Sequence, residues 1–144
     1  MRNKIAISVF LIFLSSSFQS FTQTNGNLFT VDSNFIGSLT DSASYSIHLY
    51  SRGCFHFSQD SIVISRVGEN YFLSHKSTSI QLTKEQIQKI KTFEYTLLHF
   101  DLGSGCTTVD EYSISFRGSQ VLLLDDSSCM WNGMRNLLLG LGVQ

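Results

Sequence analysis

The stretch LTKEQIQKIKTFEYTLLHF, from Leu82 to Phe100, decides the fold class because its periodicity differs from that of its surroundings. Its apolar residues recur every three or four positions, as in a helix with one buried face. Thr83 and Gln86 have the spacing of a capping box, in which each side chain bonds the other residue's backbone. The pattern predicts a helix that starts after Thr83, ends near His99, and buries Ile87, Ile90, Phe93 or Glu94, Leu97 and Leu98.

The segment before this helix alternates between apolar and polar residues, with the period of two that is typical of half-buried strands. SYSIHLY (44–50), SIVISRV (61–67) and NYFLSHK (70–76) predict three strands. The tight Gly68-Glu69 connection predicts a hairpin between the last two.

The segment after the helix predicts a second hairpin, with its turn at Arg117-Gly118 or Gly118-Ser119. A terminal helix, capped by Ser127 or Ser128, follows and buries Trp131, Met134, Leu137, Leu138 and Leu141. The element order β-β-β-α-β-β-α predicts an α+β domain with an antiparallel sheet of about five strands and two helices packed on one face.

The N-terminal residues have the pattern of a secretory signal peptide: Arg2 and Lys4 precede a short apolar run from Ile5 to Leu14, and small polar residues follow. The run is too short for a membrane span. We expect a signal peptide over 1–22, a flexible lead-in over 23–43 and a single α+β domain over 44–144. The expected location is therefore secreted or periplasmic, with no membrane span after cleavage.

The charge of the chain argues against a nucleic-acid partner. Without Arg2 and Lys4 the formal net charge changes from −1 to −3, and the remaining basic residues are scattered. Nucleic-acid binding depends largely on neutralising phosphates with clustered Lys and Arg. The glycines of GSGC, from Gly103 to Cys106, lack the rest of a phosphate-loop motif, so we expect no cofactor.

Three cysteines in an exported chain leave one unpaired or paired between molecules. If Arg117-Gly118 is the turn of the second hairpin, the numbers of two residues that face each other add up to 235. Cys106 then faces Cys129. We expect a Cys106–Cys129 disulfide, worth about 3 kcal/mol in the chain-entropy description. Three free thiols, a bond from Cys54 to one of the other two, and a dimer are the alternatives.

Cys54 and His56 stand close together in RGCFHF, the segment from Arg52 to Phe57. If the segment is extended, Phe55 and Phe57 face the core, and Cys54 and His56 share the other face. The pair could then be half of a metal site, or a thiolate assisted by an imidazole. A packed or half-buried Cys54 is the favoured interpretation, and we assign no catalytic residue and no metal ligand.

Acidic residues gather at the base of the second hairpin, where Asp110 is expected opposite Asp125, with Asp126 beside it. Like charges that face each other across two strands repel. Either they point into water as a solvated acidic rim, which we favour, or a cation such as calcium lies between them.

The segments GCFHFSQD, LTKEQI, GCTTVDEYSI and SCMWNG resemble a family of small exported proteins of Gram-negative bacteria to which no catalytic residues are assigned. The resemblance covers about Ser44 to Gly142 and implies export and a single domain. The order of elements also resembles, in layout only, the emfourin-type inhibitors of thermolysin-like proteases.

These observations predict a non-enzymatic secreted or periplasmic domain that binds another protein, as an inhibitor or an envelope accessory protein. The alternatives are an enzyme or redox protein that uses Cys54 with His56, and a metal-binding module. The sequence does not indicate an oligomeric state.

Overall fold

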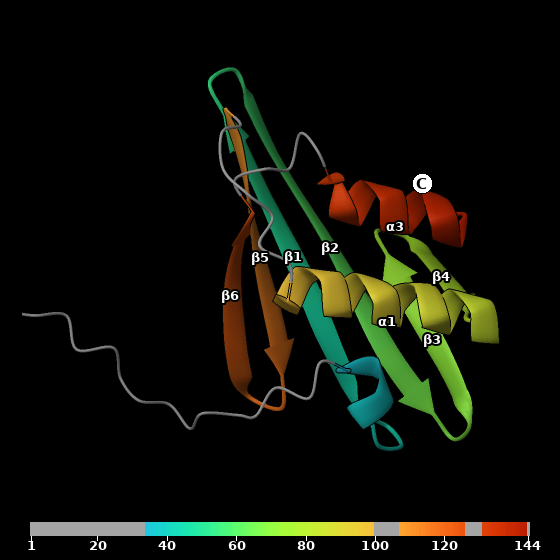
Figure 1. Ribbon diagram of the computed structural model, residues 1–144. Helices are drawn as coiled ribbons and strands as arrows, with labels where there is room; N and C mark the ends of the chain where they lie inside the picture. The colour runs from blue at the N-terminus through green and yellow to red at the C-terminus, as the bar shows by residue number, and fades with distance from the viewer. Residues whose placement is uncertain (1–33, 100–106, 126–130, 144) are drawn as a thin grey trace, which may run out of the picture.

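The computed structural model describes residues 34–99, 107–125 and 131–143, and its elements form one sheet with helices against it (Figure 1). In chain order they are η1 (Ile36–Ser38), β1 (Ser44–Gly53), β2 (His56–Val67), β3 (Asn70–His75), β4 (Thr78–Gln81), α1 (Lys84–His99), β5 (Thr108–Phe116), β6 (Ser119–Asp125) and α3 (Gly133–Leu141). The α+β prediction is confirmed.

The sheet has six antiparallel strands in the order β4-β3-β2-β1-β5-β6, against the predicted number of about five. The additional strand is β4, which has four residues and shows too short an alternation to predict from sequence. Lys76, with a φ of 51°, begins the tight turn that connects β3 to β4.

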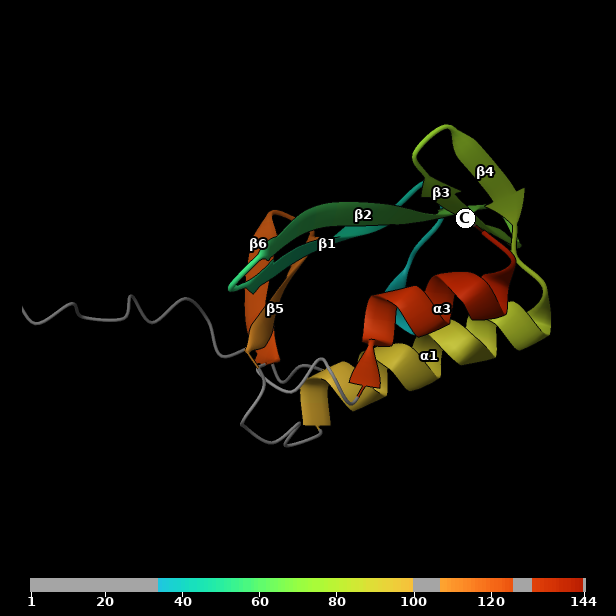
Figure 2. The ribbon, with the colours of Figure 1, turned by 90° about the horizontal axis from the view of Figure 1, so that it is seen from above.

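Both helices pack on the same face of the sheet, as predicted, and lie against each other (Figure 2). Within the described part of the chain, no helix covers the opposite face, which we call the open face. Antiparallel sheets commonly keep one face in water in this way. The β1–β2 hairpin is the longest pair and extends past α3 to a turn at Cys54-Phe55 (Figure 1).

The capping box at the start of α1 is confirmed. Gln86 N donates to Thr83 Oγ1 over 3.2 Å, and Thr83 N donates to Gln86 Oε1 over 2.9 Å. These bonds satisfy two backbone donors at the helix start. Of the predicted buried positions, Ile90, Phe93 and Leu97 are buried; Glu94 is also buried, whereas Ile87 and Leu98 are only partly so.

The register of the second hairpin is also confirmed, because Phe116 pairs with Ser119 and the pairing continues to Asp110 opposite Asp125. Arg117 and Gly118 both have positive φ, 51° and 77°, which is the geometry of the tight hairpin turns that match strand twist. After this hairpin, α3 begins at Gly133 and buries four of the predicted residues, with Trp131 partly buried: Met134, Leu137, Leu138 and Leu141. The predicted caps Ser127 and Ser128 lie outside the described residues.

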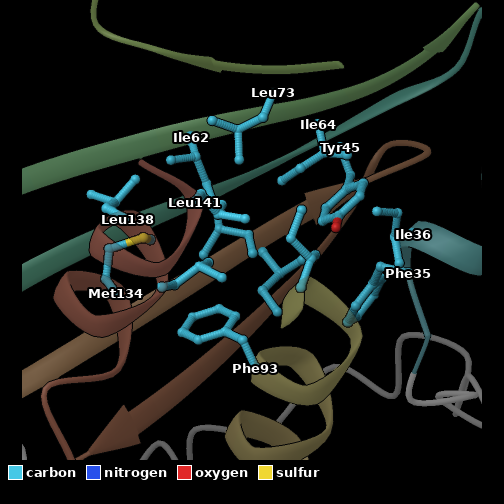
Figure 3. Packing of buried hydrophobic residues seen from close by; sticks show 14 of the residues in the cluster. Phe35, Ile36, Tyr45, Ile62, Ile64, Leu73, Phe93, Met134, Leu138 and Leu141 are labelled. Carbon is cyan, nitrogen blue, oxygen red and sulfur yellow. The ribbon is translucent and has the colours of Figure 1, made fainter. Parts of the chain in front are cut away.

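The hydrophobic core lies between the sheet and the two helices, and it includes residues that precede β1 (Figure 3). Phe35, Ile36 and Leu39 are buried, and the Phe35 ring stacks on Tyr45 at 5.9 Å between centroids. The prediction of a flexible lead-in over 23–43 is therefore wrong for residues 34–43. Its apolar residues occur singly, so no periodicity marked them as part of the core.

No helix in the described part of the chain is long and apolar enough to cross a membrane.

Candidate functional site

Cys54 and Phe55 form the two-residue turn of the β1–β2 hairpin, in which Gly53 pairs with His56. Phe55 is fully exposed, and Phe57 is 64% exposed. The prediction that these two phenylalanines face the core is wrong, because the chain reverses at the turn instead of continuing as one strand.

Cys54 is an exposed free thiol at this turn, so the favoured prediction of a packed or half-buried residue is wrong. His56 belongs to β2, where its Nε2 lies 3.2 Å from Ser58 Oγ. This hydrogen bond between His56 and Ser58 thus runs along a single strand. The hypotheses that Cys54 and His56 form a reactive thiol pair or part of a metal site stay predictions. The hydrogen bond between His56 and Ser58 does not support either of them.

A group of polar side chains occupies the helix-facing side of the sheet near this hairpin end. We call it the polar end and define it as Ser51, His56, Ser58, Asp110 and Asp125. Ser51 pairs with Ser58 on one side and Asp110 on the other, and Asp110 in turn pairs with Asp125. Side chains on alternate residues of a strand share a face, so the register brings these groups together.

The two aspartates of the polar end are buried: Asp110 is 6% exposed and Asp125 is 0% exposed. The favoured prediction of a solvated acidic rim is therefore wrong. The register of the hairpin was right, but the rim interpretation assumed that both side chains point into water, whereas they share the helix-facing side with Tyr112 and Ile114. Asp126, the third residue of the expected rim, lies outside the described residues.

Burial raises the pKa of the Asp110 carboxyl. The hydroxyl of Ser51 donates a hydrogen bond to Asp110 and acts in the opposite direction, while the charge of Asp125 raises the pKa further and that of His56 lowers it. Atom Oδ1 of Asp110 is buried and has no hydrogen-bond partner in the structure. A buried acceptor without a donor is unfavourable, so Asp110 is not explained by the surrounding fold alone.

Gly53 lets β1 approach β5 closely beside the polar end. A Cβ at this position would lie 2.9 Å from Thr108 Oγ1 and 3.3 Å from the carbonyl oxygen of Thr107. The close approach of the two strands therefore favours glycine at this position.

The open face carries exposed apolar side chains toward the same end of the sheet. Leu122 and Leu124 of β6 are 61% and 71% exposed, because Leu123 between them faces the helices. Phe57 lies on the open face of β2, and Phe55 stands at the hairpin turn. We call Phe55, Phe57, Leu122 and Leu124 the open-face patch.

An ion pair connects the two halves of this patch. Arg52 Nη2 lies 2.8 Å from Glu111 Oε2, and both side chains project from the open face. Arg52 neighbours Phe57 on β2, and Glu111 neighbours Leu124 on β6. Apolar groups thus flank a charged pair across four adjacent strands.

A second buried carboxylate, Glu94 of α1, holds the N-terminal segment against the helix. It accepts hydrogen bonds from Tyr45 Oη and from Ile36 N, the latter over 3.2 Å. Burial raises the pKa of Glu94 to about 7, although these donors and the charge of Lys91 act to lower it. The helical period allowed position 94 on the buried face, but nothing in the sequence identified Tyr45 or Ile36 as its partners.

His75 at the end of β3 is also buried, and its Nε2 lies 2.8 Å from Asp60 Oδ1 of β2. This pair could not be predicted from the sequence, because the two residues are in different strands and neither belongs to a motif. Asp60 is only half-buried, so the pair connects the core to the surface.

A groove of about 410 Å³ lies between α1 and α3, with Phe93 and Leu137 among its lining residues. The ring of Trp131 stacks on Phe93 at 5.4 Å between centroids, and it also contacts Tyr112. Trp131 therefore belongs to the edge of the core, which agrees with its predicted role as an anchor of the last helix.

The expected disulfide between Cys106 and Cys129 lies outside the described residues and stays a prediction. Among the residues that the structure describes, no group of three or more His, Cys, Asp and Glu side chains could hold a metal ion.

Comparison with known proteins finds no match to the chain among family models, curated proteins or solved structures. The candidate sites therefore have to be interpreted from their own geometry.

Proposed function

We propose that this chain is an exported, non-enzymatic domain that binds another protein through the open face of its sheet. The observation that supports this function is the open-face patch: Phe57, Leu122 and Leu124 are exposed on the face that no described helix covers, and Phe55 is exposed at the adjoining hairpin turn. Clustered exposed apolar side chains on a small domain commonly mark a surface that another protein covers. Export rests on the signal-peptide pattern of the first residues.

The arrangement of the patch fits a protein interface. Protein interfaces bury apolar and aromatic anchors, and arginine is enriched among the residues that contribute most to binding. Phe57 and Leu124 supply such anchors, and Arg52 lies beside Phe57 with its side chain 60% exposed. A partner that covers the patch would bury both anchors and the Arg52–Glu111 pair together.

The partner we propose is a protein with a largely apolar contact surface. Ten basic against eleven acidic residues in the chain give no net positive charge for a polyanion. Roles as an inhibitor or an envelope accessory protein both require this kind of contact.

Site-specific photocrosslinking tests the proposal. p-Benzoylphenylalanine would replace Phe57 or Leu124 in the full chain, expressed in the cells that produce it. The matched control carries the same group at Tyr95 of α1, which is similarly exposed on the helical side. We expect one discrete adduct from positions 57 and 124 and none from 95.

A second substitution makes the test specific. Leu124→Asp introduced with the crosslinker at 57 should remove the adduct, because a charge replaces an anchor without touching the core. An adduct of twice the chain's mass would identify a second copy as the occupant and exclude a different partner. Equal labelling from position 95, or an adduct that survives Leu124→Asp, would contradict binding through this face.

A further inference from the structure

The two outer strands of the sheet differ in how they are protected from pairing with another chain. β4, at one edge, has four residues, three of them polar. β6, at the other edge, has seven residues, reads SQVLLLD and pairs with β5 without a bulge. Proteins usually shield an edge strand by making it short, or with charges, proline or a bulge. From Ser119 to Leu124, β6 has none of these features.

The outer side of β6 carries backbone groups that β5 cannot bond. The two-residue turn at Arg117-Gly118 makes the residues on either side of it a hydrogen-bonded pair, and such pairs alternate along antiparallel strands. Gln120, Leu122 and Leu124 therefore direct their N–H and C=O groups away from β5. In the part of the chain that the structure describes, no strand lies on that side of β6 (Figure 1).

The sequence of β6 is self-complementary when two copies pair antiparallel about Leu122. Leu122 then faces Leu122 of the second copy, and Gln120 faces Leu124, with all of these side chains on the open face. On the helix-facing side, Val121 faces Leu123, and both are partly buried apolar residues at the rim of the core. Apolar pairs therefore meet across the seam on both faces of the sheet.

Exposure and charge at this seam also favour a second copy. Leu122 and Leu124 are 61% and 71% exposed, so pairing would remove apolar surface from water. The one charged residue of β6, Asp125, would face Ser119, so no like charges meet. A two-fold arrangement uses the same surface patch from both copies, which is the common geometry of homodimers.

We propose that two copies of this chain pair through their β6 edges, antiparallel and centred on Leu122, to form one continuous sheet. A second copy is the occupant because the same strand supplies the backbone groups and the matching apolar side chains for both sides of the seam. The pairing lies in the plane of the sheet and leaves Phe57 of β2 uncovered. It therefore goes beyond the proposed binding of another protein, and it places two open-face patches on one surface.

Sedimentation velocity of the purified full chain tests the pairing. We expect a shift from monomer to dimer with rising concentration, up to about 1 mM. Leu122→Lys should weaken dimerisation about tenfold or more, because the two-fold axis brings two lysines together in place of two leucines. The matched control is Val67→Lys, which places the same charge at a 59% exposed position of β2 and should leave the dimer unchanged.

Cysteines along the seam test its register. In a hydrogen-bonded antiparallel pair the facing Cα atoms lie about 5.5 Å apart, which a disulfide can span. In a Cys54→Ser background, which removes the exposed native thiol, Leu122→Cys should form a linked dimer and Val67→Cys should not. Gln120→Cys mixed with Leu124→Cys should also link, and neither should link alone. Circular dichroism verifies that each protein is folded.

Three outcomes would overturn the pairing: a monomer at every concentration, equal dimerisation by the Leu122→Lys and Val67→Lys proteins, or equal disulfide formation at positions 122 and 67. A monomeric chain whose position 124 captures a different protein would also overturn it, and would assign the edge to strand addition by that protein.

Photocrosslinking separates this pairing from the proposed function. Leu124 lies at the seam, so an adduct of twice the chain's mass from position 124 reports the pairing. β1 and β5 separate Phe57 from β6, so position 57 reports the partner on the open face. A monomeric chain that keeps the adduct with a different protein at position 57 overturns the pairing alone. A dimer without that adduct overturns the proposed function alone.

Discussion

Two regions of the core bury carboxylates, and the protein treats them differently. Glu94 is 0% exposed and accepts hydrogen bonds from Tyr45 Oη and the backbone of Ile36. Asp110 faces another carboxylate and keeps one oxygen without a donor. Donors that belong to the fold satisfy the first carboxylate, whereas the second faces a like charge across the strand pair. Burial alone does not distinguish the two, but the neighbours do.

Removal of the first carboxylate should have the largest effect. Glu94→Ala leaves the Tyr45 hydroxyl and the Ile36 amide buried without an acceptor and opens a cavity, so we expect a loss of about 3–5 kcal/mol in the free energy of unfolding. Urea denaturation measures it. Glu85→Ala, on the exposed side of the same helix, should change stability by less than about 0.5 kcal/mol. Equal losses of unfolding free energy in the two proteins would show that the hydrogen bonds of Glu94 do not stabilise the fold.

Stability should depend on pH through the same residue. The pKa of Glu94 is raised from 4.5 to about 7 in the folded protein, so the folded state binds this proton more tightly than the unfolded state does. Its contribution is complete below pH 4.5 and is lost as the pH rises to 7, by up to about 3 kcal/mol.

Urea midpoints between pH 4.5 and 8 measure this decline. The charged and titratable groups that face Glu94 are Lys91 of α1 and Tyr45 of β1, and burial raises the pKa of Tyr45 well above its usual value. Glu94→Gln should flatten the profile. A decline that persists in that protein would assign it to other groups, among them Asp110.

Tyr45→Phe sharpens the comparison by removing one donor and keeping the ring. We expect a loss of about 1–2 kcal/mol near neutral pH, because the carboxylate loses a hydrogen bond in a buried place. The pKa of Glu94 should rise further, since the Tyr45 hydroxyl lowers it. Carboxyl titration by NMR measures the shift, and an unchanged pKa would exclude this bond as a contributor.

The smallest expected effect has the opposite sign. Asp110→Asn should stabilise the protein by about 1 kcal/mol or less, because it removes one of two directly opposed carboxylates. Thermal melting at pH 7.5 shows the change. A destabilised Asp110→Asn protein would mean that the fold itself uses this carboxylate, and the contrast with Glu94 would disappear.

The sequence predicted those parts of the molecule that depend on local patterns. The capping box at Thr83 and the turn at Arg117-Gly118 need only a few adjacent residues, and both are confirmed. From that turn the pairing of Asp110 with Asp125 follows by counting. Counting along the strands does not show which side of the sheet the helices cover. The burial of Asp110 and Asp125 was therefore not predicted.

Contacts between distant segments account for the other differences. Phe55 and Phe57 were assigned to the core because aromatic residues usually are, and the turn at Cys54-Phe55 gives no glycine-asparagine signal. The Tyr45, Ile36 and Glu94 cluster joins three elements through side chains that follow no motif. Such contacts form only in the complete fold, and no local pattern in a single sequence shows which distant residues will meet.

The tie between Ile36 and Glu94 also has a consequence for the order in which the molecule assembles. The two residues are 58 positions apart, so a chain that emerges from its N-terminus first presents Ile36 long before its acceptor exists. Closing so long a loop has an entropic cost, and the contacts that offset it form only when α1 packs against the sheet. Residues 34–39 should therefore become protected from hydrogen exchange late in folding, after the β1–β2 and β2–β3 hairpins, whose strands are neighbours along the chain.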